Sequence, residues 1–355
     1  MKNWDIIIVG AGIIGLSLAR ELRKSGTKIL VVERGEPGRE ASSAAAGMLV
    51  DASEETLPAL QPLASASARM YPEFVHELQD ESGMNVDLRD QGTIVLRRDE
   101  NPIASPKNSL TTENLAQLEP SLCDIKLCAV LLKERSVDPR ALSTAALKAA
   151  RHREVDISSG TTATDLLLAD GRISGVVTEK SYYHAPIVVN CAGAWAGTFS
   201  THHFPTRPVR GQMLSVVGGP KLQHVVRSPD VYLVPRTDGR ILIGSTVEEA
   251  GFNKRTDRET IQRLHHAAIG LVPEIAQARI HEDWAGLRPG TPDNLPILGT
   301  TSTPGYFVAA GHFRDGILLT PITALLMAQV IRGVRQELDM TAFSPARFSS
   351  ETTAP

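Results

Sequence analysis

The sequence predicts an α/β fold in two parts: a doubly wound domain built on a parallel sheet, and a second, mainly antiparallel β domain of the α+β type. Residues 6–9 and 28–32 are short, mostly apolar, β-branched runs separated by a helical pattern. Such runs are typical of strands buried on both faces of a parallel sheet, and residues 187–191 repeat them. From residue 208 onward, shorter alternating strands are joined by turns such as Thr237-Asp-Gly239.

Length and composition limit the class of protein. A chain of 355 residues corresponds to about two domains, and its 42% hydrophobic content is ample for buried cores. The formal net charge is −3 without a long basic run, so nothing indicates nucleic-acid binding. The three cysteines, Cys123, Cys128 and Cys191, fit neither a metal-ligand spacing nor a disulfide framework. We therefore expect no bound metal, and a small buried thiol at Cys191.

The start of the chain and its longest apolar stretch bear on location. The first residues enter a strand within a few positions, which leaves no room for a signal peptide. Residues 317–331 are too short to span a bilayer and include Thr320, Pro321 and Gln329. We expect a protein without a membrane span in the reducing cytoplasm, and the sequence leaves open whether it forms a homo-oligomer.

The opening strand runs into a glycine-rich turn. Gly10, Gly12 and Gly15 form the pattern G-x-G-x-x-G in front of a helical pattern at residues 16–24. In the Rossmann fold these glycines allow a tight turn, a close approach of pyrophosphate and close helix–strand packing, while the helix N–H groups face the phosphates. Glu33 ends the second strand, where an acid accepts hydrogen bonds from a ribose hydroxyl and would repel the 2′-phosphate of NADP. The sequence therefore predicts a dinucleotide site; a glycine turn that only packs is the alternative.

End signals place several helices. Asp138 followed by Pro139 is an N-cap with proline at the first helical position. Thr256 and Glu259 form a capping box, and Thr320 caps a helix that begins with proline. Helices are predicted over residues 63–79, 113–118, 140–152, 256–271 and 321–333. Strands are predicted within residues 86–97, 160–178, 187–191, 210–217, 231–236 and 240–246.

Three further stretches are candidates for chemistry. Residues 41–48 are a run of small side chains, which lets the backbone approach a large flat ligand, although the start of a helix is the alternative. Residues 284–299 hold Arg288 between glycines, and residues 309–321 hold His312 in a glycine-rich loop. That loop feeds a helix N-terminus, whose positive partial charge would face whatever lies in front of it.

Together these stretches resemble the D-amino-acid oxidase superfamily of FAD-dependent oxidoreductases, and most closely the glycine oxidases of thiamine biosynthesis. The resemblance covers residues 5–331. Its most specific motifs are Ser43-Ala-Ala-Ala-Gly-Met-Leu49, Gly286-Leu-Arg-Pro-Gly-Thr291 and Ala310-Gly-His-Phe-Arg-Asp-Gly-Ile-Leu-Leu319. It implies FAD with its ADP half on the opening motif and its isoalloxazine between a glutathione-reductase-like FAD-binding domain and a substrate domain.

Strands that come far later in the chain are expected to join the sheet that carries the opening motif. We therefore expect the FAD-binding domain to be discontinuous in sequence. We assign to it residues 1–85, 135–205 and 285–345. The substrate domain then takes residues 86–134 and 206–284, and residues 346–355 are expected to be a disordered tail.

The resemblance also implies which residues contact the cofactor. The implied set is Gly10, Gly12, Ile13, Ile14, Gly15, Glu33, Arg34, Ser42, Ser43, Ala45, Ala46, Gly47, Met48, Thr162, Gly193, Arg314, Gly316, Ile317 and Leu318. No cysteine follows the loop at residues 310–316, so the covalent flavin link of monomeric sarcosine oxidases is not expected. The FAD is expected to be bound non-covalently.

On the substrate side the resemblance places Arg288 on the substrate carboxylate and Tyr232 beside it. A bidentate arginine–carboxylate pair fixes geometry as well as charge, which orients the Cα–H bond toward flavin N5. A structural ion pair for Arg288 and a half-buried strand position for Tyr232 are the alternatives. Substrate that enters with a neutral amine requires no protein base, so we nominate none, and His312 is expected to hydrogen-bond the flavin or to pack.

Departures from the family pattern put the substrate in doubt. Asp230 stands where the glycine oxidases carry histidine, and Val247 replaces a methionine that lines their pocket. Asp230, Val247 and Arg314 are therefore assigned to the substrate pocket, and an ion pair between Asp230 and a substrate ammonium group is one hypothesis for the acid.

The resulting hypothesis is an FAD-dependent amino-acid oxidase acting on glycine or another small amino acid, such as sarcosine or a D-amino acid. Hydride transfer to flavin would give an imine that hydrolyses to an oxo acid and ammonia, and O₂ as the electron acceptor would give H₂O₂. A D-amino-acid or imino-acid dehydrogenase that passes electrons to a quinone or carrier is the alternative within enzymes. A non-catalytic flavin-binding subunit is the alternative of another class, and an NAD-dependent enzyme is disfavoured because no second glycine-rich βαβ motif is visible.

Overall fold

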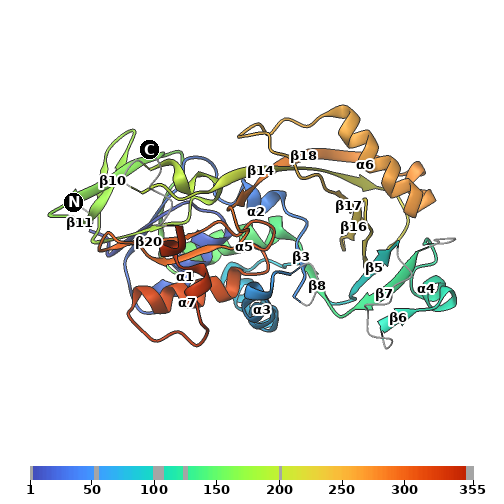
Figure 1. The fold of residues 1–355 in the computed structure, drawn as a ribbon, viewed down its shortest axis with the longest axis horizontal. Helices are drawn as coiled ribbons and strands as arrows, with labels where there is room; N and C mark the ends of the chain where they lie inside the picture. Colours follow the sequence, from blue (N-terminus) through green and yellow to red (C-terminus); the bar gives the residue numbers. More distant parts are fainter. Residues whose placement is uncertain (1–2, 52–55, 99–107, 123–126, 200–201, 349–355) are drawn as a thin grey trace.

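Two large sheets dominate the computed structural model, which describes residues 3–51, 56–98, 108–122, 127–199 and 202–348. One sheet carries the opening motif and lies toward the left of Figure 1, with helices packed below it. The other lies toward the right, and its long strands β14 (Arg207–Val217) and β18 (Arg279–Gly290) reach back across the molecule toward the first sheet. The α/β fold class predicted from the sequence is confirmed.

The first sheet is parallel at its centre. Its order is β19 (Ile297–Thr300), β20 (Tyr306–Ala310), β13 (Ile187–Asn190), β1 (Ile6–Val9), β2 (Ile29–Val32) and β9 (Asp156–Ser158). Only β19 and β20 pair antiparallel. Val9 pairs with Asn190, and the Cys191 N–H donates to the Val9 carbonyl at 2.8 Å. The ends of β1 and β13, each followed by glycine, therefore lie side by side.

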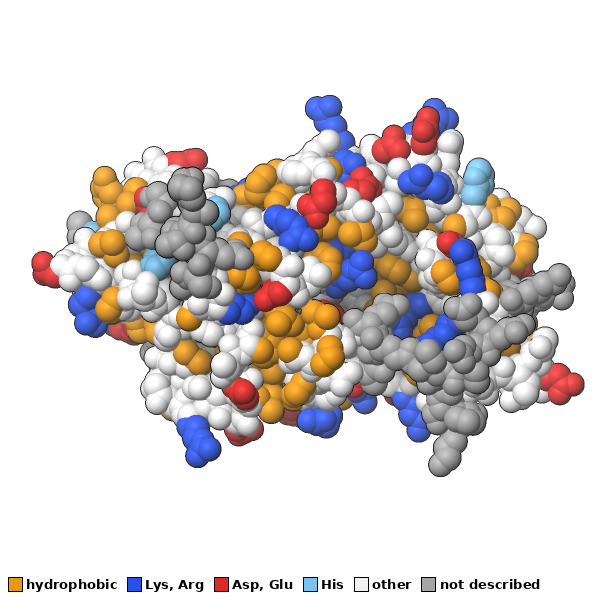
Figure 2. All heavy atoms as spheres, viewed as in Figure 1, with side chains coloured by type: hydrophobic (Ala, Val, Ile, Leu, Met, Phe, Trp, Pro, Cys, Tyr) orange, Lys and Arg blue, Asp and Glu red, His pale blue; other side chains and the backbone are white. Residues whose placement is uncertain are grey.

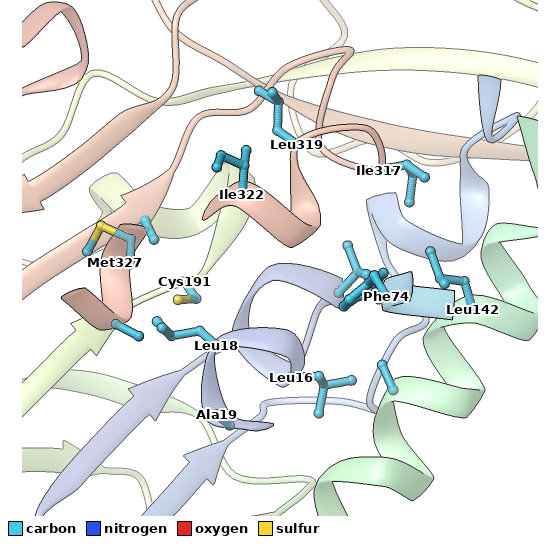
Figure 3. Packing of buried hydrophobic residues seen from close by; sticks show 14 of the residues in the cluster. Leu16, Leu18, Ala19, Phe74, Leu142, Cys191, Ile317, Leu319, Ile322 and Met327 are labelled. Atoms are coloured by element: carbon cyan, nitrogen blue, oxygen red, sulfur yellow. The ribbon is translucent and has the colours of Figure 1, made fainter. Parts of the chain in front are cut away.

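Four helices from different parts of the chain share one core with this sheet: α1 (Ile13–Arg23), α3 (Gln61–Ser82), α5 (Pro139–His152) and α7 (Thr320–Ile331). The chain also forms α2 (Ala41–Ala44), α4 (Thr112–Leu118) and α6 (Arg258–Leu271), of which α4 and α6 contribute to a separate core. Figure 3 shows Leu18 of α1 near Cys191 and Met327 of α7, and Phe74 of α3 near Leu142 of α5. Cys191 is buried, which confirms the buried thiol, and burial raises its pKa. The core thus lies directly behind the glycine-rich turn.

Helix α3 is longer than the predicted 63–79 and runs through Pro72. Proline has no N–H, so the Ala68 carbonyl four residues earlier lacks its helical partner. Arg135 Nη1 donates to that carbonyl at 3.3 Å instead. The side chain of Arg135, which comes from a distant part of the chain, therefore replaces the helical hydrogen bond that a proline at this position cannot form.

Two helix starts differ from prediction by one residue. Asp257, not Thr256, is the N-cap of α6, because its carboxylate accepts from the Thr260 N–H at 2.9 Å. Helix α7 begins at Thr320, so this threonine is the first helical residue and not the cap. Its hydroxyl donates to the Gly316 carbonyl, four residues earlier, at 2.7 Å. Asp138 caps α5 as predicted, accepting from the Arg140 N–H at 2.8 Å.

The second sheet is antiparallel except for one pair. Its order is β18, β14, β17 (Ile241–Gly244), β16 (Tyr232–Pro235), β15 (Val225–Arg227), β5 (Thr93–Arg97), β7 (Cys128–Leu132) and β6 (Ser109–Leu110). Strands β15 and β5 are the parallel pair. Helix α6 packs on this sheet through Ile261, Leu264 and Ala268. The pairing in this sheet therefore agrees with the second, mainly antiparallel β domain predicted from the sequence.

Smaller elements complete the chain. Two three-stranded sheets contain β10 (Ala163–Ala169), β11 (Arg172–Thr178) and β12 (Tyr182–His184), and β3 (Met48–Leu49), β8 (Arg135–Val137) and β4 (Leu88–Arg89). Short 3-10 helices are η1 (Pro58–Leu60), η3 (Gly193–Thr198), η4 (Pro273–Gln277), η5 (Thr341–Phe343) and η6 (Pro345–Phe348).

The first residues of the expected tail are structured. Residues 346–348 belong to η6, and Arg347 Nε donates to Asp293 Oδ2 at 2.8 Å, so this part is held against the body of the protein. The remainder of the predicted tail, and Cys123, lie outside the described residues.

None of the described helices is both long enough and apolar enough to cross a membrane. Figure 2 shows acidic and basic side chains spread over this face of the molecule without one large patch of either sign.

Candidate active site

A cavity of about 660 Å³ lies between the two large sheets, within the usual range for a ligand pocket. Its wall comes from the β1–α1 turn, residues 41–48, the end of β13, the facing strands of the second sheet and residues 309–317. Segments that are far apart in the sequence therefore converge on one space. The cavity has two sides, which differ in how they are built.

On the first side the glycine-rich turn closes against the end of β13. Gly10 has φ of +104°, which residues with a side chain rarely adopt, and a Cβ there would lie 2.5 Å from the Cys191 carbonyl oxygen. A Cβ at Gly15 would lie 2.0 Å from the Gly10 carbonyl oxygen, so Gly15 packs helix α1 on the turn and lies behind the cavity wall. Gly12, Ile13 and Ile14 line the cavity.

Glu33 and Arg34 follow β2 at the same end of the sheet. The Glu33 carboxylate accepts from the Ala11 N–H at 2.8 Å and the Gly35 N–H at 2.9 Å, and it lines the cavity. It thus braces the glycine turn and still has acceptor capacity for a hydroxyl, since a carboxylate offers about four lone-pair sites. The Arg34 guanidinium lies 3.5 Å above the Trp195 ring and pairs with Glu40 at 2.8 Å.

The small-residue segment at 41–48 contains both structures that its sequence allowed. A short helix, α2, comes first, and an extended stretch that lines the cavity follows it. Two of its backbone carbonyls accept hydrogen bonds from side chains that do not line the cavity. Trp284 Nε1 donates to the Ala44 carbonyl at 3.1 Å, and Arg236 Nη2 donates to the Ala46 carbonyl at 2.5 Å. A trans peptide points its C=O and the next N–H in opposite directions. The Ala45 and Gly47 N–H groups therefore face away from these donors, and neither donates to another described residue.

Two serines in this segment have different positions. Ser42 lines the cavity and accepts from the Ile13 N–H at 2.9 Å, so it occupies one free N–H of α1. Ser43 lies outside the cavity wall, where its hydroxyl donates to the Glu40 carbonyl at 3.3 Å and its carbonyl accepts from Arg140. Ala45, Ala46, Gly47 and Met48 line the cavity.

The loop before α7 closes this side. Arg314, Gly316 and Ile317 line the cavity together with Thr162 and Gly193, whereas Leu318 is buried in the core. Helix α3 holds the loop in place: the Tyr71 hydroxyl donates to the Ile317 carbonyl at 2.6 Å, and the Ser67 hydroxyl donates to the Leu318 carbonyl at 2.6 Å. Of the predicted cofactor residues, only Gly15, Ser43 and Leu318 lie off the cavity wall.

Arg288 is the central side chain of the second side. Its Nη2 donates to Ser245 Oγ at 2.6 Å and its Nη1 to the Thr246 carbonyl at 3.0 Å. Burial, and to a lesser extent the nearby Arg314, lower its pKa. The guanidinium keeps its charge, as arginine does in proteins. No carboxylate of the described residues lies within 4 Å of this guanidinium. Arg288 is half-buried, and a partly desolvated cation without an acidic partner is left for a ligand to neutralise, so the structural ion-pair alternative finds no support.

Tyr232 lies next to Arg288 and packs flat on Gly244, the residue opposite it on the neighbouring strand. A Cβ at Gly244 would lie 2.7 Å from the tyrosine oxygen, and a Cβ at Gly211 would lie 2.3 Å from Arg288 Nη1. The tyrosine hydroxyl is 3.5 Å from Met213 Sδ. Two strand glycines therefore give the arginine and the tyrosine the room to lie against the sheet.

The other predicted pocket residues lie at the rim. Asp230 lines the cavity but forms an ion pair with Arg98, and both side chains are more than half exposed. The structure thus gives Asp230 a protein partner, which weakens the hypothesis of a substrate ammonium partner. Val247 is also half exposed. Arg314 lies beside Asp315, and burial raises the pKa of Asp315 to about 6, an effect that Arg314 opposes.

His312 lies on the cavity wall but is buried. Its Nε2 is 3.2 Å from Thr323 Oγ1 of α7, and burial lowers its pKa to about 4. The ring is therefore neutral at physiological pH and tied to the helix, which supports a packing role over a base.

Sequence reasoning missed several residues that shape the cavity. Gly211, Gly244 and Met213 are recognisable only once the strand register is known. Arg227 lines the cavity because it pairs directly with Tyr232 across β15 and β16, a register that the sequence pattern does not fix. Arg236 is buried behind the cavity wall, and burial lowers its pKa to about 10. In the sequence, the position of Arg236 directly after an apolar strand is the one feature that points to its burial.

The first side suits an extended dinucleotide. A glycine turn that excludes side chains, an acid at the end of β2 and unpaired backbone N–H groups at Ala45 and Gly47 are the groups that pyrophosphate, ribose and a flat ring require. The match to known proteins agrees. Residues 5–330 match the family model described as DAO, FAD dependent oxidoreductase.

Individual relatives cover the whole chain. The bifunctional protein ThiO/ThiG of Trichormus variabilis is 36% identical over 98% of this chain, which spans 56% of that longer protein. The hydrogen cyanide synthase subunit HcnC of Pseudomonas aeruginosa is 33% identical over 99% of this chain and 98% of that protein. The crystal structure of glycine oxidase from Geobacillus kaustophilus superposes with a TM-score of 0.92 at 33% identity, covering 98% of this chain and 99% of that one. The chain therefore belongs to the DAO family of FAD-dependent oxidoreductases.

Proposed function

We propose that this protein oxidises the amine of glycine or another small amino acid, with FAD as the resident cofactor. The observation that carries the proposal is Arg288: a half-buried guanidinium on the wall of the cavity, without a carboxylate partner among the described residues. A carboxylate bound there would satisfy the charge and place the rest of a small molecule in the cavity. The relatives named as glycine oxidase support the same substrate class.

The cofactor would lie on the first side of the cavity. The glycine turn, Glu33 and Arg34 would hold its ADP part, and the backbone at 45–48 with the loop at 314–317 would hold the flavin ring. Bound FAD supplies an acceptor for two electrons and a hydrogen, which no protein side chain provides. We propose the division into a discontinuous FAD-binding domain (1–85, 135–205 and 285–345) and a substrate domain (86–134 and 206–284) on this basis.

The side chains of the second side would orient the substrate. Arg288 would hold the carboxylate, and the Tyr232 hydroxyl would donate to the same carboxylate or accept from the amine. A substrate fixed in this way presents one Cα–H bond to the cofactor, and orientation of this kind is a large part of catalysis. His312, neutral and bound to Thr323, does not serve as a base, and a neutral amine does not need one.

For glycine the balanced overall reaction is glycine, water and O₂ giving glyoxylate, ammonia and hydrogen peroxide. The C–H and N–H hydrogens leave the amine with two electrons, water adds to the resulting C=N bond, and O₂ takes up the electrons. O₂ as the acceptor is part of the proposal, as are a cytoplasmic location and non-covalent FAD. Electron transfer to a quinone or carrier, and a non-catalytic subunit, are the other outcomes of the test below.

The test is an anaerobic titration of the purified yellow protein with glycine, sarcosine, D-alanine and D-proline. Loss of the visible flavin absorbance with at least one of them, followed by stoichiometric peroxide when air is admitted, is the expected result. Bleaching without peroxide would replace the oxidase with a dehydrogenase. No bleaching by any of these amines would remove the proposed reaction.

A further inference from the structure

A second arginine lies in the cavity across Tyr232 from Arg288. Arg227 ends β15 and pairs directly with Tyr232 of β16, and Tyr232 pairs with Gly244 of β17. Side chains of directly paired residues lie on the same face of a sheet. Arg227, Tyr232 and the surface above Gly244 therefore form one continuous row, and all three residues line the cavity.

The Arg227 guanidinium is held from behind. Its Nη2 donates to Glu134 Oε1 at 3.2 Å, and the Glu134 side chain is 2% exposed, so the acid lies in the interior. Nε is buried without a hydrogen-bond partner, and Nη1 donates to no described residue. Its burial closes Nε to a ligand, so Nη1 is the nitrogen of this ion pair that is left to bind an anionic group in the cavity.

Two acids lie near this row, and each has another arginine close to it. Asp230 pairs with Arg98 at the rim, and Asp315 lies beside Arg314. Arg288 and the free edge of Arg227 are left to bind anionic groups. An amino acid with a single carboxylate satisfies only Arg288.

The spacing fits a ligand with two acidic groups. Arg288 is bound at Ser245 and Thr246, immediately after β17, and Arg227 lies two strands away on β15. Arg288 itself stands on β18, but its guanidinium is held at the end of β17. Since neighbouring strands are about 4.8 Å apart, this point lies roughly 10 Å from the backbone of Arg227. A diacid of four or five carbons, counting the two carboxylate carbons, can bridge this distance, since each carboxylate stands about 3 Å from its arginine nitrogens.

We propose that Arg227 is a second anion-binding group of the substrate pocket, which selects amino acids that carry a further carboxylate on the side chain or on the nitrogen. This inference rests on the proposed function, because Arg288 must hold the first carboxylate. It assigns to this chain a substrate with two acidic groups rather than glycine as the best substrate.

The test is equilibrium binding of unreactive acids to the FAD-loaded protein, followed by the change in flavin absorbance. The probes are succinate and glutarate, each against the monocarboxylate of equal chain length, butyrate and pentanoate. At least one diacid is expected to bind about tenfold more tightly than its monocarboxylate. The advantage should fall below about threefold in Arg227→Gln and persist in Arg279→Gln, an exposed arginine at the far end of β18.

The double variant Glu134→Gln with Arg227→Gln covers the case in which Arg227→Gln alone fails to fold, since it leaves no buried carboxylate unpaired. Equal affinities for diacid and monocarboxylate, or an advantage that survives in the Arg227 variants, would overturn the inference while leaving the proposed function intact. If neither kind of acid perturbs the flavin, the carboxylate site at Arg288 fails and the inference fails with it.

Discussion

The two sides of the cavity recognise their ligands in different ways. The cofactor side is built mainly from backbone: a glycine turn at residue 10, the amide groups at Ala45 and Gly47, and carbonyls tied back by Trp284 and Arg236. The substrate side is built from long side chains, Arg288, Tyr232 and Arg227, that stand on strands of a twisted antiparallel sheet.

This difference has consequences for tolerance to change. Backbone recognition depends on conformations that only certain residues can adopt, so it fails abruptly when a side chain is added. Side-chain recognition can be altered one group at a time while the sheet stays intact. One family can therefore keep its cofactor site and vary its substrate, because the two properties reside in separate parts of the wall.

The largest effect is expected from Gly10→Ala. The new Cβ would lie 2.5 Å from the Cys191 carbonyl oxygen, a backbone atom that cannot move without displacing β13. We expect protein that purifies without visible flavin absorbance. Gly171→Ala is the matched control, because Gly171 also has positive φ but its Cβ would meet nothing within 4 Å. Equal flavin content in the two variants would show that close approach at residue 10 is not required.

The scaffold behind the cofactor side is expected to depend on pH through Glu81. Burial opposes ionisation of Glu81, but hydrogen bonds from Arg20 and Arg153 outweigh it and lower its pKa to about 2. A lowered pKa contributes stability that is present above the unfolded value, near 4.5, and is lost as pH falls toward 2. Glu81→Gln should lower the free energy of unfolding by about 2–3 kcal/mol at pH 7.

The measurement is thermal unfolding of wild type and Glu81→Gln at pH 7 and pH 3, where the difference between them should shrink. Glu154→Gln is the control, since its ion pair with Arg23 involves a side chain that is 82% exposed. A Glu81 effect that is no larger than the Glu154 effect would contradict the burial argument.

On the substrate side, Arg288→Lys keeps the charge but removes the planar fork. We expect kcat/KM for the best substrate to fall by about 10- to 100-fold, equivalent to roughly 1.5–3 kcal/mol for a charged hydrogen bond. Flavin content should stay near that of wild type, in contrast to Gly10→Ala. Arg279→Lys, on the same strand but exposed, serves as the control. Unchanged kinetics in Arg288→Lys would place the substrate elsewhere.

The smallest effect is expected from Tyr232→Phe, which removes one hydroxyl and leaves the ring packed on Gly244. A loss of about 0.5–1.5 kcal/mol, or three- to tenfold in kcat/KM, follows if the hydroxyl bonds the substrate. Gly244→Ala should cost more, because it displaces the whole ring. Steady-state kinetics of the two variants decide between the roles. Unchanged kcat/KM in Tyr232→Phe, with a loss only in Gly244→Ala, would mean that Tyr232 only fills space, as the half-buried strand alternative holds.

The same contrast explains which features the sequence predicts. The strand at 6–9, the glycine turn and Glu33 are local patterns with fixed geometry, so residues on the cofactor side could be named from spacing and resemblance. Helix caps were placed to within one residue, and Asp257 displaced Thr256 because local hydrogen bonding decides between neighbours. Continuation of α3 through Pro72 required Arg135, which lies far away in the chain.

The substrate side is less predictable because it depends on register. Arg227 faces the cavity only because β15 pairs with β16 at Tyr232, and a shift of one residue would turn it to the other face. The ion pair of Asp230 with Arg98 joins residues 132 positions apart, so no local pattern marks it. Arg288 was named through the family motif, and its lack of an acidic partner emerged only from the packing of the described residues around it.

A crystal structure of the FAD-loaded protein with acetate, an unreactive carboxylate, tests the central role of Arg288 most directly. We predict that both acetate oxygens lie within hydrogen-bond distance of the Arg288 guanidinium, with the methyl group directed toward the flavin ring. Acetate bound elsewhere, or an Arg288 side chain turned away from the cavity with cofactor present, would contradict the proposed function.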